Sequence, residues 1–266
     1  MKVTPRPNTE RGQRDLGWLK AFHTFSVPGF DRPDHERWGP LRVINEDRIA
    51  EGTGFGLHRH QDFEIFSYIV GGELEHRDTM NHNEVLKRGD IQMTSAGSGI
   101  QHSEHAHGAH SAHLLQIWAF PTATGLAPKY FTRTFSDAEK ADKWVCVVAP
   151  AGVEGVVEEF SAKGPAPIHS PLTLFATMIS EGQHVTHAFL KGTEGKERKG
   201  YLQLSQRSAY NTGAASGAHV RVLGAERGPV ELREGDGAYV VATPGEDITV
   251  ENIGQGVAEV LLFDME

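Results

Sequence analysis

Histidines and carboxylates recur at short, regular spacings within residues 52–104, and this stretch constrains what the chain can fold into. His58 and His60 stand two residues apart, as do His102 and Glu104 further along the chain. Because side chains alternate faces along a β-strand, each pair is expected to project from one side of a strand. Three imidazoles and a carboxylate suit iron, nickel, copper, manganese or zinc, whereas calcium prefers oxygen ligands. The stretch therefore predicts a metal site.

Glu64 is a further candidate, because the same alternation would carry it onto the face of His58 and His60. Asp62 is expected to share that face, while Arg59 is expected to point away from the ion. The spacing leaves two roles open for Glu64. It is either a metal ligand or a residue that supports the ligands through hydrogen bonds.

Short β-rich segments separated by glycine turns fill residues 40–120. Residues 41–47 alternate before a turn, residues 66–70 end at a Gly-Gly pair, and residues 73–77 alternate as the returning strand. Strands repeated at such short intervals indicate an all-β sandwich or barrel. The glycines at 52, 54 and 56 are expected to let the backbone approach another segment closely.

The second half of the chain repeats the first at a constant offset of 146 positions. Leu86–Asp90 aligns with Leu232–Asp236, and no gap is needed to align Ala112 with Ala258. A short capped helix at 136–141 is expected at the boundary. The sequence therefore predicts two domains, residues 1–135 and residues 136–266.

The offset places the candidate ligands of the first half on apolar residues of the second. His102 falls on Ile248, and Glu104 falls on Val250. We therefore expect one ion per chain, held by the first domain, and a second domain that has lost its metal site.

Composition excludes several classes of protein. The formal net charge of −9 and the lack of a basic stripe argue against direct nucleic-acid binding. No apolar run is long enough to span a membrane or resembles a signal peptide, so a cytoplasmic protein is expected. The single cysteine, Cys146, excludes an intrachain disulfide and is expected to act as a small buried apolar residue.

The metal-site stretch resembles a known motif. The first cupin motif is matched at every position by the spacing Gly52-x5-His58-x-His60-x3-Glu64-x6-Gly71. The second cupin motif is only partly present, because Ser95 stands where proline is usual and His102 comes two residues late. That departure, with Glu104 two residues after His102, resembles the pirin family of double cupins, and further similarity covers most of residues 17–120.

The resemblance implies a fold of two tandem cupin β-barrels with a metal in the first. In pirins the ion is held by two histidines of a His-x-His, a third histidine and the glutamate after it, which here are His58, His60, His102 and Glu104. Glu64 is then displaced from its usual cupin role. Iron is the family's usual metal, so we expect one Fe(II), with nickel, copper, manganese or zinc as alternatives.

The resemblance also implies a function. The family includes members that cleave flavonols with dioxygen, so a quercetin 2,3-dioxygenase-like oxidoreductase with a small phenolic substrate is expected, and Glu104 would act as its general base. The family also includes nuclear co-regulators of transcription. The alternative is therefore a non-enzymatic, redox-sensitive iron-binding protein, which would be nuclear in a eukaryote. An inert scaffold cupin is a third possibility, and a monomer is expected.

Further histidines surround these candidates. The four between residues 105 and 113 exceed what one site can use, so they are expected in a solvated loop, with substrate contact as the alternative. His76 and His82 flank a polar turn and are expected on the surface.

Overall fold

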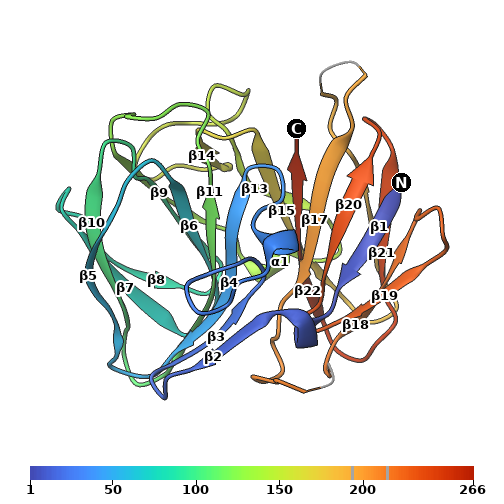
Figure 1. Cartoon of the computed structure of the whole chain (residues 1–266), viewed down its shortest axis with the longest axis horizontal. Helices are drawn as coiled ribbons and strands as arrows, with labels where there is room; N and C mark the ends of the chain where they lie inside the picture. Colours follow the sequence, from blue (N-terminus) through green and yellow to red (C-terminus); the bar gives the residue numbers. More distant parts are fainter. Residues whose placement is uncertain (193–194, 214–215) are drawn as a thin grey trace. The chain divides into compact units, whose positions relative to one another are not determined.

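The computed structural model describes residues 1–192, 195–213 and 216–266, and these residues form an almost entirely β structure (Figure 1). They divide into two compact units. Unit 1 comprises Met1–Arg11, Asp137–Val148 and Leu172–Glu266, and unit 2 comprises Gly12–Ser136 and Ala149–Pro171. Because the units interleave along the chain, the division between residues 135 and 136 stays a prediction.

Unit 2 contains two sheets. Its elements are β2 (Gly12–Asp15), β3 (Leu19–His23), η2 (Pro33–His35), β4 (Leu41–Ile49), β5 (Gly54–His60), β6 (Glu64–Gly71), β7 (Glu73–Asp78), β8 (Asn83–Lys87), β9 (Asp90–Ser95), β10 (Ile100–Ala106), β11 (Ala112–Ala119), β12 (Lys129–Thr134) and β14 (Ala166–Ile168). The larger sheet follows the order β12-β9-β6-β11-β4-β3-β2 and the smaller follows the order β5-β10-β7-β8.

Unit 1 has the same organisation. Its elements are β1 (Lys2–Arg6), η1 (Asn8–Glu10), α1 (Asp137–Lys140), the first residues of β13 (Val145–Pro150), β15 (Leu172–Ile179), β16 (His184–Ala188), β17 (Arg198–Leu204), β18 (His219–Leu223), β19 (Val230–Arg233), β20 (Gly237–Ala242), β21 (Asp247–Asn252) and β22 (Ala258–Met265). The larger sheet runs in the order β1-β20-β17-β22-β15-β13 and the smaller in the order β16-β21-β18-β19.

The repeat seen in the sequence is also a repeat of strands. Both ends of β11 precede the corresponding ends of β22 by 146 residues. The run β9-β6-β11-β4 in unit 2 corresponds to the run β20-β17-β22-β15 in unit 1, and β5-β10-β7-β8 corresponds to β16-β21-β18-β19. The all-β class predicted from the sequence is confirmed.

The core of unit 2 lies between its two sheets. One apolar cluster joins Ile69 and Leu114 of the larger sheet to Leu74 and Leu86 of the smaller. Elsewhere the buried residues include polar side chains, among them His102. In unit 1 the corresponding space holds a larger apolar cluster drawn from both sheets.

Smaller expectations can be checked in the same structure. The predicted helix at the boundary is present as the single turn α1. Cys146 is half-buried rather than buried, and burial raises the pKa of its thiol to about 11. No helix in the described part of the chain is both long and apolar enough to cross a membrane.

Candidate metal centre

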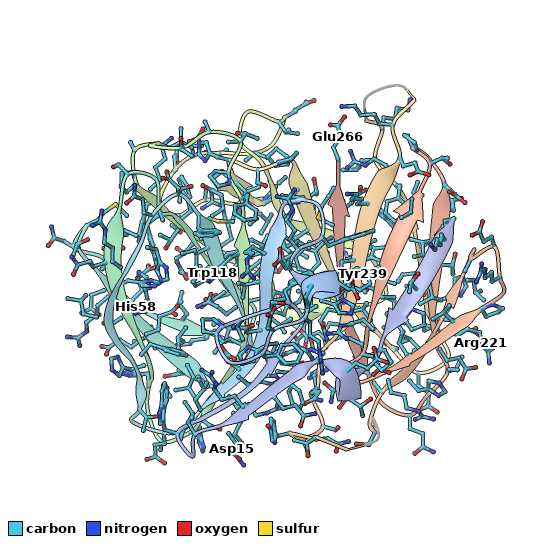
Figure 2. All side chains as sticks on the ribbon, viewed as in Figure 1. Asp15, His58, Trp118, Arg221, Tyr239 and Glu266 are labelled. Atoms are coloured by element: carbon cyan, nitrogen blue, oxygen red, sulfur yellow. The ribbon has the colours of Figure 1, made fainter. Side chains whose placement is uncertain are left out.

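The pairing of β5 with β10 brings the predicted ligand histidines together. His58 lies directly opposite His102 in this ladder, and their Nε2 atoms are 3.1 Å apart. The ring centroid of His60 lies 4.7 Å from that of His58 and 4.8 Å from that of His102. One ring nitrogen from each of the three lies within 4.8 Å of the others. His60 also packs edge-on against Trp118, which Figure 2 labels together with His58.

Hydrogen bonds orient these rings. His58 Nδ1 lies 2.8 Å from the carbonyl oxygen of Gly56, which can only accept, so Nδ1 carries the proton. In the neutral ring the lone pair is then on Nε2, the atom that faces His102. His102 Nδ1 is buried and has no hydrogen-bond partner among the described residues. The Nε2 atoms of His58 and His102 therefore face the same space, where an ion would accept their lone pairs.

Burial keeps two of the imidazoles neutral. Burial, followed by the neighbouring His102 and His58, lowers the pKa of His60 to about 4. Burial, followed by His76 and His58, lowers the pKa of His102 to about 3. Both rings are therefore uncharged near pH 7 and need not lose a proton to bind an ion.

Glu104 lies beside His102 but is held by residues of the other sheet. Its side chain is 1% exposed, and its Oε2 accepts a hydrogen bond of 2.8 Å from Gln116 Nε2. Ser67 Oγ lies 3.4 Å from its Oε1. One oxygen of Glu104 falls within 4.8 Å of ring nitrogens of both His76 and His102. The structure thus places Glu104 next to His102, in a second group that contains His76 instead of His58 and His60.

His76 is not on the surface as the sequence analysis expected. It is fully buried, because β7 pairs with β10 and sets His76 directly opposite Glu104. Its Nε2 lies 3.3 Å from Asp78 Oδ2, and its ring centroid is 5.2 Å from that of His102. The signal that could have found it is the alternation of β7, where Leu74 and His76 share the inward face.

Asp78 links His76 to the turn beyond it. His82 Nδ1 lies 2.8 Å from Asp78 Oδ2, and His82 is partly exposed, not fully at the surface. Burial alone would raise the pKa of Asp78, but hydrogen bonds from His76 and His82 outweigh it and lower the pKa to about 2. Asp78 is therefore ionised and bound to both histidines.

The sequence predicted that strand alternation continues from His60 to Glu64, and this prediction was wrong. β5 ends at His60, and Asp62 takes a left-handed backbone conformation with φ of 54° before β6 begins at Glu64. Glu64 Oε2 instead accepts hydrogen bonds from Ser95 Oγ at 2.8 Å and from the backbone N–H of His169 at 3.1 Å. Burial raises the pKa of Glu64. A supporting role for Glu64 stays a prediction.

The four histidines between residues 105 and 113 have different environments. His107 and His110 are exposed between β10 and β11, as the sequence predicted. His105 is half-buried within β10, and His113 lies in β11 with its Nε2 3.0 Å from Glu46 Oε1. The loop expected from the sequence is therefore shorter than the histidine run.

The residues of unit 1 that align with His102 and Glu104 are apolar. Ile248 and Val250 are fully buried within its hydrophobic cluster. One histidine remains, because His187 lies opposite Ile248 in the β16–β21 ladder, as His58 lies opposite His102. Its Nε2 is 3.0 Å from Asp264 Oδ2, so its partner is a carboxylate of the same unit. Loss of the second metal site stays a prediction.

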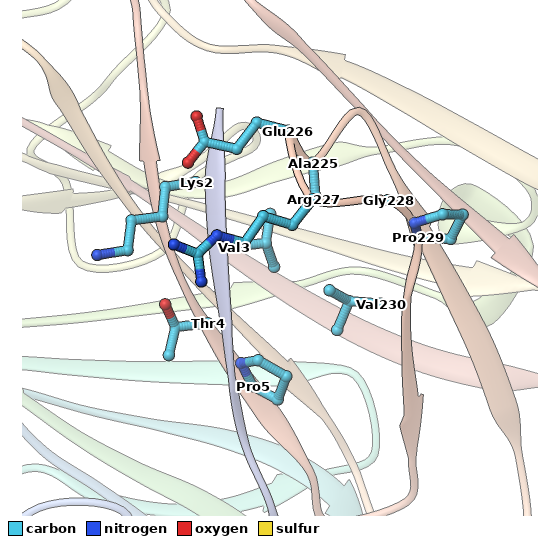
Figure 3. A pocket seen from close by; sticks show the side chains of 10 residues that line it. All are labelled: Lys2, Val3, Thr4, Pro5, Ala225, Glu226, Arg227, Gly228, Pro229 and Val230. Atoms are coloured by element: carbon cyan, nitrogen blue, oxygen red, sulfur yellow. The ribbon is translucent and has the colours of Figure 1, made fainter.

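Two surface cavities are lined by other residues. One, of about 280 Å³, lies in unit 1 between residues 2–5 of β1 and the turn at residues 225–230 (Figure 3). The other, of about 200 Å³, is lined by Arg59, Thr79 and residues 98–101. Arg59 thus faces outward, as the alternation of β5 predicts. Neither cavity includes the candidate ligands.

The chain is similar to known proteins in sequence and in fold. A family model described as Pirin matches residues 5–119. The chain is 34% identical over 200 residues to a pirin-like protein of Caulobacter vibrioides, covering 75% of this chain and 81% of the relative. It is 33% identical over 200 residues to quercetin 2,3-dioxygenase of Escherichia coli strain K12, covering 75% of this chain and 79% of the relative. The crystal structure of bacterial pirin YhhW from Escherichia coli in complex with nickel(II) matches with a TM-score of 0.78 and 29% identity, covering 99% of this chain and 98% of that one.

Proposed function

The chain belongs to the pirin family, and we propose that it is a metal-dependent dioxygenase that opens flavonols such as quercetin with dioxygen. One observation carries the proposal. Three imidazoles from paired strands converge within 4.8 Å of one another, with the buried Glu104 next to His102. The double-cupin fold expected from the sequence accords with the likeness to the bacterial pirin structure.

The donor set fits a first-row metal ion. His58, His60, His102 and Glu104 would hold it, and Fe(II) is the ion we propose, with nickel, copper, manganese or zinc as alternatives. The Nε2 atoms of His58 and His102, which lie 3.1 Å apart while the proton of His58 is held on Nδ1, support this assignment. When bound, such an ion supplies Lewis acidity toward a substrate with adjacent hydroxyl and carbonyl oxygens.

Glu104 is the proposed general base. It would accept the proton of the flavonol 3-hydroxyl, because its carboxylate is buried and held in one orientation beside the histidines. The deprotonated flavonol would then react with dioxygen. Both oxygen atoms enter the ring-opened product and the carbon that bore the hydroxyl leaves as carbon monoxide, so no external reductant is needed.

Substrate would approach from the side of His58. His58 is half-buried whereas His102 is fully buried, and the ring centroid of Phe55 lies 6.3 Å from that of His58. An aromatic side chain beside His58 suits an aromatic substrate. The buried side, with His76 and Glu104, would exclude water from the reacting atoms.

The test is anaerobic titration of iron-loaded protein with quercetin, followed by admission of air. We expect flavonol absorbance to decline with equal amounts of dioxygen consumed and carbon monoxide released. His102→Ala should show no decline above the protein-free rate. Flavonol absorbance that persists in the iron-loaded protein, and in protein loaded with each alternative metal, would refute the proposal.

A further inference from the structure

Two residues outside the expected ligand set hold the carboxylate of Glu104. Gln116 Nε2 donates to Glu104 Oε2 at 2.8 Å, and Ser67 Oγ lies 2.9 Å from Gln116 Oε1. All three side chains are buried. Because the NH2 group of Gln116 donates to Glu104, the amide oxygen faces Ser67 and accepts a hydrogen bond from its hydroxyl. The bonds therefore run in one direction, from Ser67 through Gln116 to Glu104.

This chain of bonds connects the two sheets of the barrel. Ser67 on β6 pairs directly with Gln116 on β11 in the larger sheet, whereas Glu104 belongs to β10 of the smaller sheet. The second lone pair of each Glu104 oxygen is left for an ion or for a substrate proton. The amide thus fixes the carboxylate without using up its acceptor capacity.

Unit 1 shows what stands at these positions where the histidines and glutamate are absent. The offset of 146 residues takes Gln116 to Leu262, and the residue paired with Leu262 in the β17–β22 ladder is Leu202. Leu202 therefore corresponds to Ser67, which pairs with Gln116 in the same way. Both leucines are fully buried in the apolar cluster.

The residue at the position of Glu104 also differs between the two units. Val250 replaces Glu104 in unit 1 and is buried in the same cluster as the two leucines. Serine, glutamine and glutamate in one barrel thus become two leucines and a valine in the other. A buried amide or hydroxyl is unfavourable without a hydrogen-bond partner. The three polar side chains are therefore expected to occur together or to be replaced together by apolar ones.

We propose that Gln116, oriented by Ser67, is a positioning residue that holds the Glu104 carboxylate toward the ion-binding histidines. The inference rests on the proposed function for its catalytic consequence, but it also makes a claim about ion binding alone. Hydrogen-bond partners of this kind set the orientation of a ligand, and their removal lowers metal affinity by about 10- to 100-fold.

The test uses Co2+ alone, titrated into the chelator-treated full-length protein. Gln116→Met keeps the length of the side chain and removes the donor. We expect its Co2+ affinity, measured by chelator competition, to fall by about 10- to 100-fold, with a shifted visible absorption spectrum. Ser67→Ala should give a smaller change of the same kind. If Gln116→Met does not fold, Ser67→Ala decides alone, and an unchanged affinity and spectrum would overturn the proposal.

A double-mutant cycle separates positioning from a general loss of stability. In a Glu104→Ala background, Gln116→Met should cause no further loss of affinity, because the residue it acts through is gone. The matched control is Gln203→Met, which removes a buried amide from unit 1 that donates to backbone carbonyls. It should keep full Co2+ affinity.

Two results would overturn the proposal. One is Co2+ affinity within twofold of the parent in Gln116→Met, with the same spectrum. The other is an equal loss with and without Glu104. If the parent protein binds Co2+ but its iron form never consumes quercetin, the proposed function fails while the affinity comparison still decides this inference.

Discussion

The Nε2 atoms of His58 and His102 lie 3.1 Å apart across the paired strands β5 and β10. The Gly56 carbonyl fixes the proton of His58 on Nδ1, so the lone pair of His58 points at its partner. A slip of one residue between the strands would turn one of the two rings to the opposite face. The candidate centre is therefore a property of this ladder's register.

Removal of His102 should remove the ion. We expect His102→Ala, purified from cells, to contain almost no metal where the parent contains about one ion per chain, because one of three converging imidazoles is lost. Elemental analysis of freshly purified protein measures this directly and also identifies the metal. His184→Ala, an exposed histidine on β16, should keep the full content.

His187 offers a sharper comparison, because it takes the place of His58 in the matching ladder. His187→Ala should keep its metal but melt at a lower temperature, since Asp264 loses a buried partner. A full ion in His102→Ala would contradict the ligand role of His102. Metal loss in His187→Ala would point to a second site in unit 1.

Gly54 lets β5 approach β10 behind the site. A Cβ added there would lie 2.1 Å from the backbone oxygen of Glu104 and 2.5 Å from the Cα of His105. Gly54→Ala must therefore displace the strand that carries His102, and we expect a loss of about 1–3 kcal/mol in the free energy of unfolding together with weaker metal binding. Urea unfolding and Co2+ titration measure the two effects.

Gly56→Ala is the matched control, because an added Cβ at Gly56 meets no atom within 4 Å. It should leave both quantities close to those of the parent. Equal effects of the two substitutions would mean that the close approach at Gly54 does not matter.

Acid should destabilise the metal-free protein. Burial lowers the pKa of His60 to about 4 and that of His102 to about 3, below the ordinary value of 6.5. As the pH falls below 6.5, the unfolded chain takes up protons at both residues while the folded chain does not. Stability rises with pH where the unfolded state binds more protons, so the free energy of unfolding falls from pH 6.5 toward pH 4.

Urea unfolding of chelator-treated protein between pH 7 and pH 4.5 tests this dependence. His102→Asn removes one of the two groups and should flatten part of the slope. A parent profile that is level over this range would show that neither ring is protected from protons in the folded state.

Sequence periodicity predicted that each pair of candidate ligands shares a face, because each pair lies within one strand, β5 or β10, where side chains alternate. It failed at Glu64, because the left-handed conformation at Asp62 breaks the strand and nothing in the local pattern requires that break. It also missed His76, whose polar neighbours suggested a surface turn although Leu74 marked the buried face.

Gln116 and Ser67 could not be found by spacing at all. Each resembles an ordinary strand residue, and its partner on β10 is set by the packing of one sheet on another. Only the repeat at an offset of 146 residues gives a signal in the sequence, because Gln116 aligns with the apolar Leu262 just as Glu104 aligns with the apolar Val250. The interleaving of the two units is likewise a product of strand pairing, because β1 pairs with β20 near the other end of the chain.

The buried carboxylates of Glu64 and Glu104 allow a direct test of which one serves the ion. Glu64→Gln should keep about one ion per chain and stay within about 1 kcal/mol of the parent in stability, because the glutamine oxygen can accept the bonds from Ser95 and the His169 N–H. Glu104→Gln should weaken metal binding and lower kcat for flavonol cleavage by about 10²- to 10⁴-fold, since an amide cannot accept the proton. Elemental analysis and steady-state kinetics on both variants measure this. The reverse pattern, with metal lost from Glu64→Gln and kept in Glu104→Gln, would assign the ligand role to Glu64.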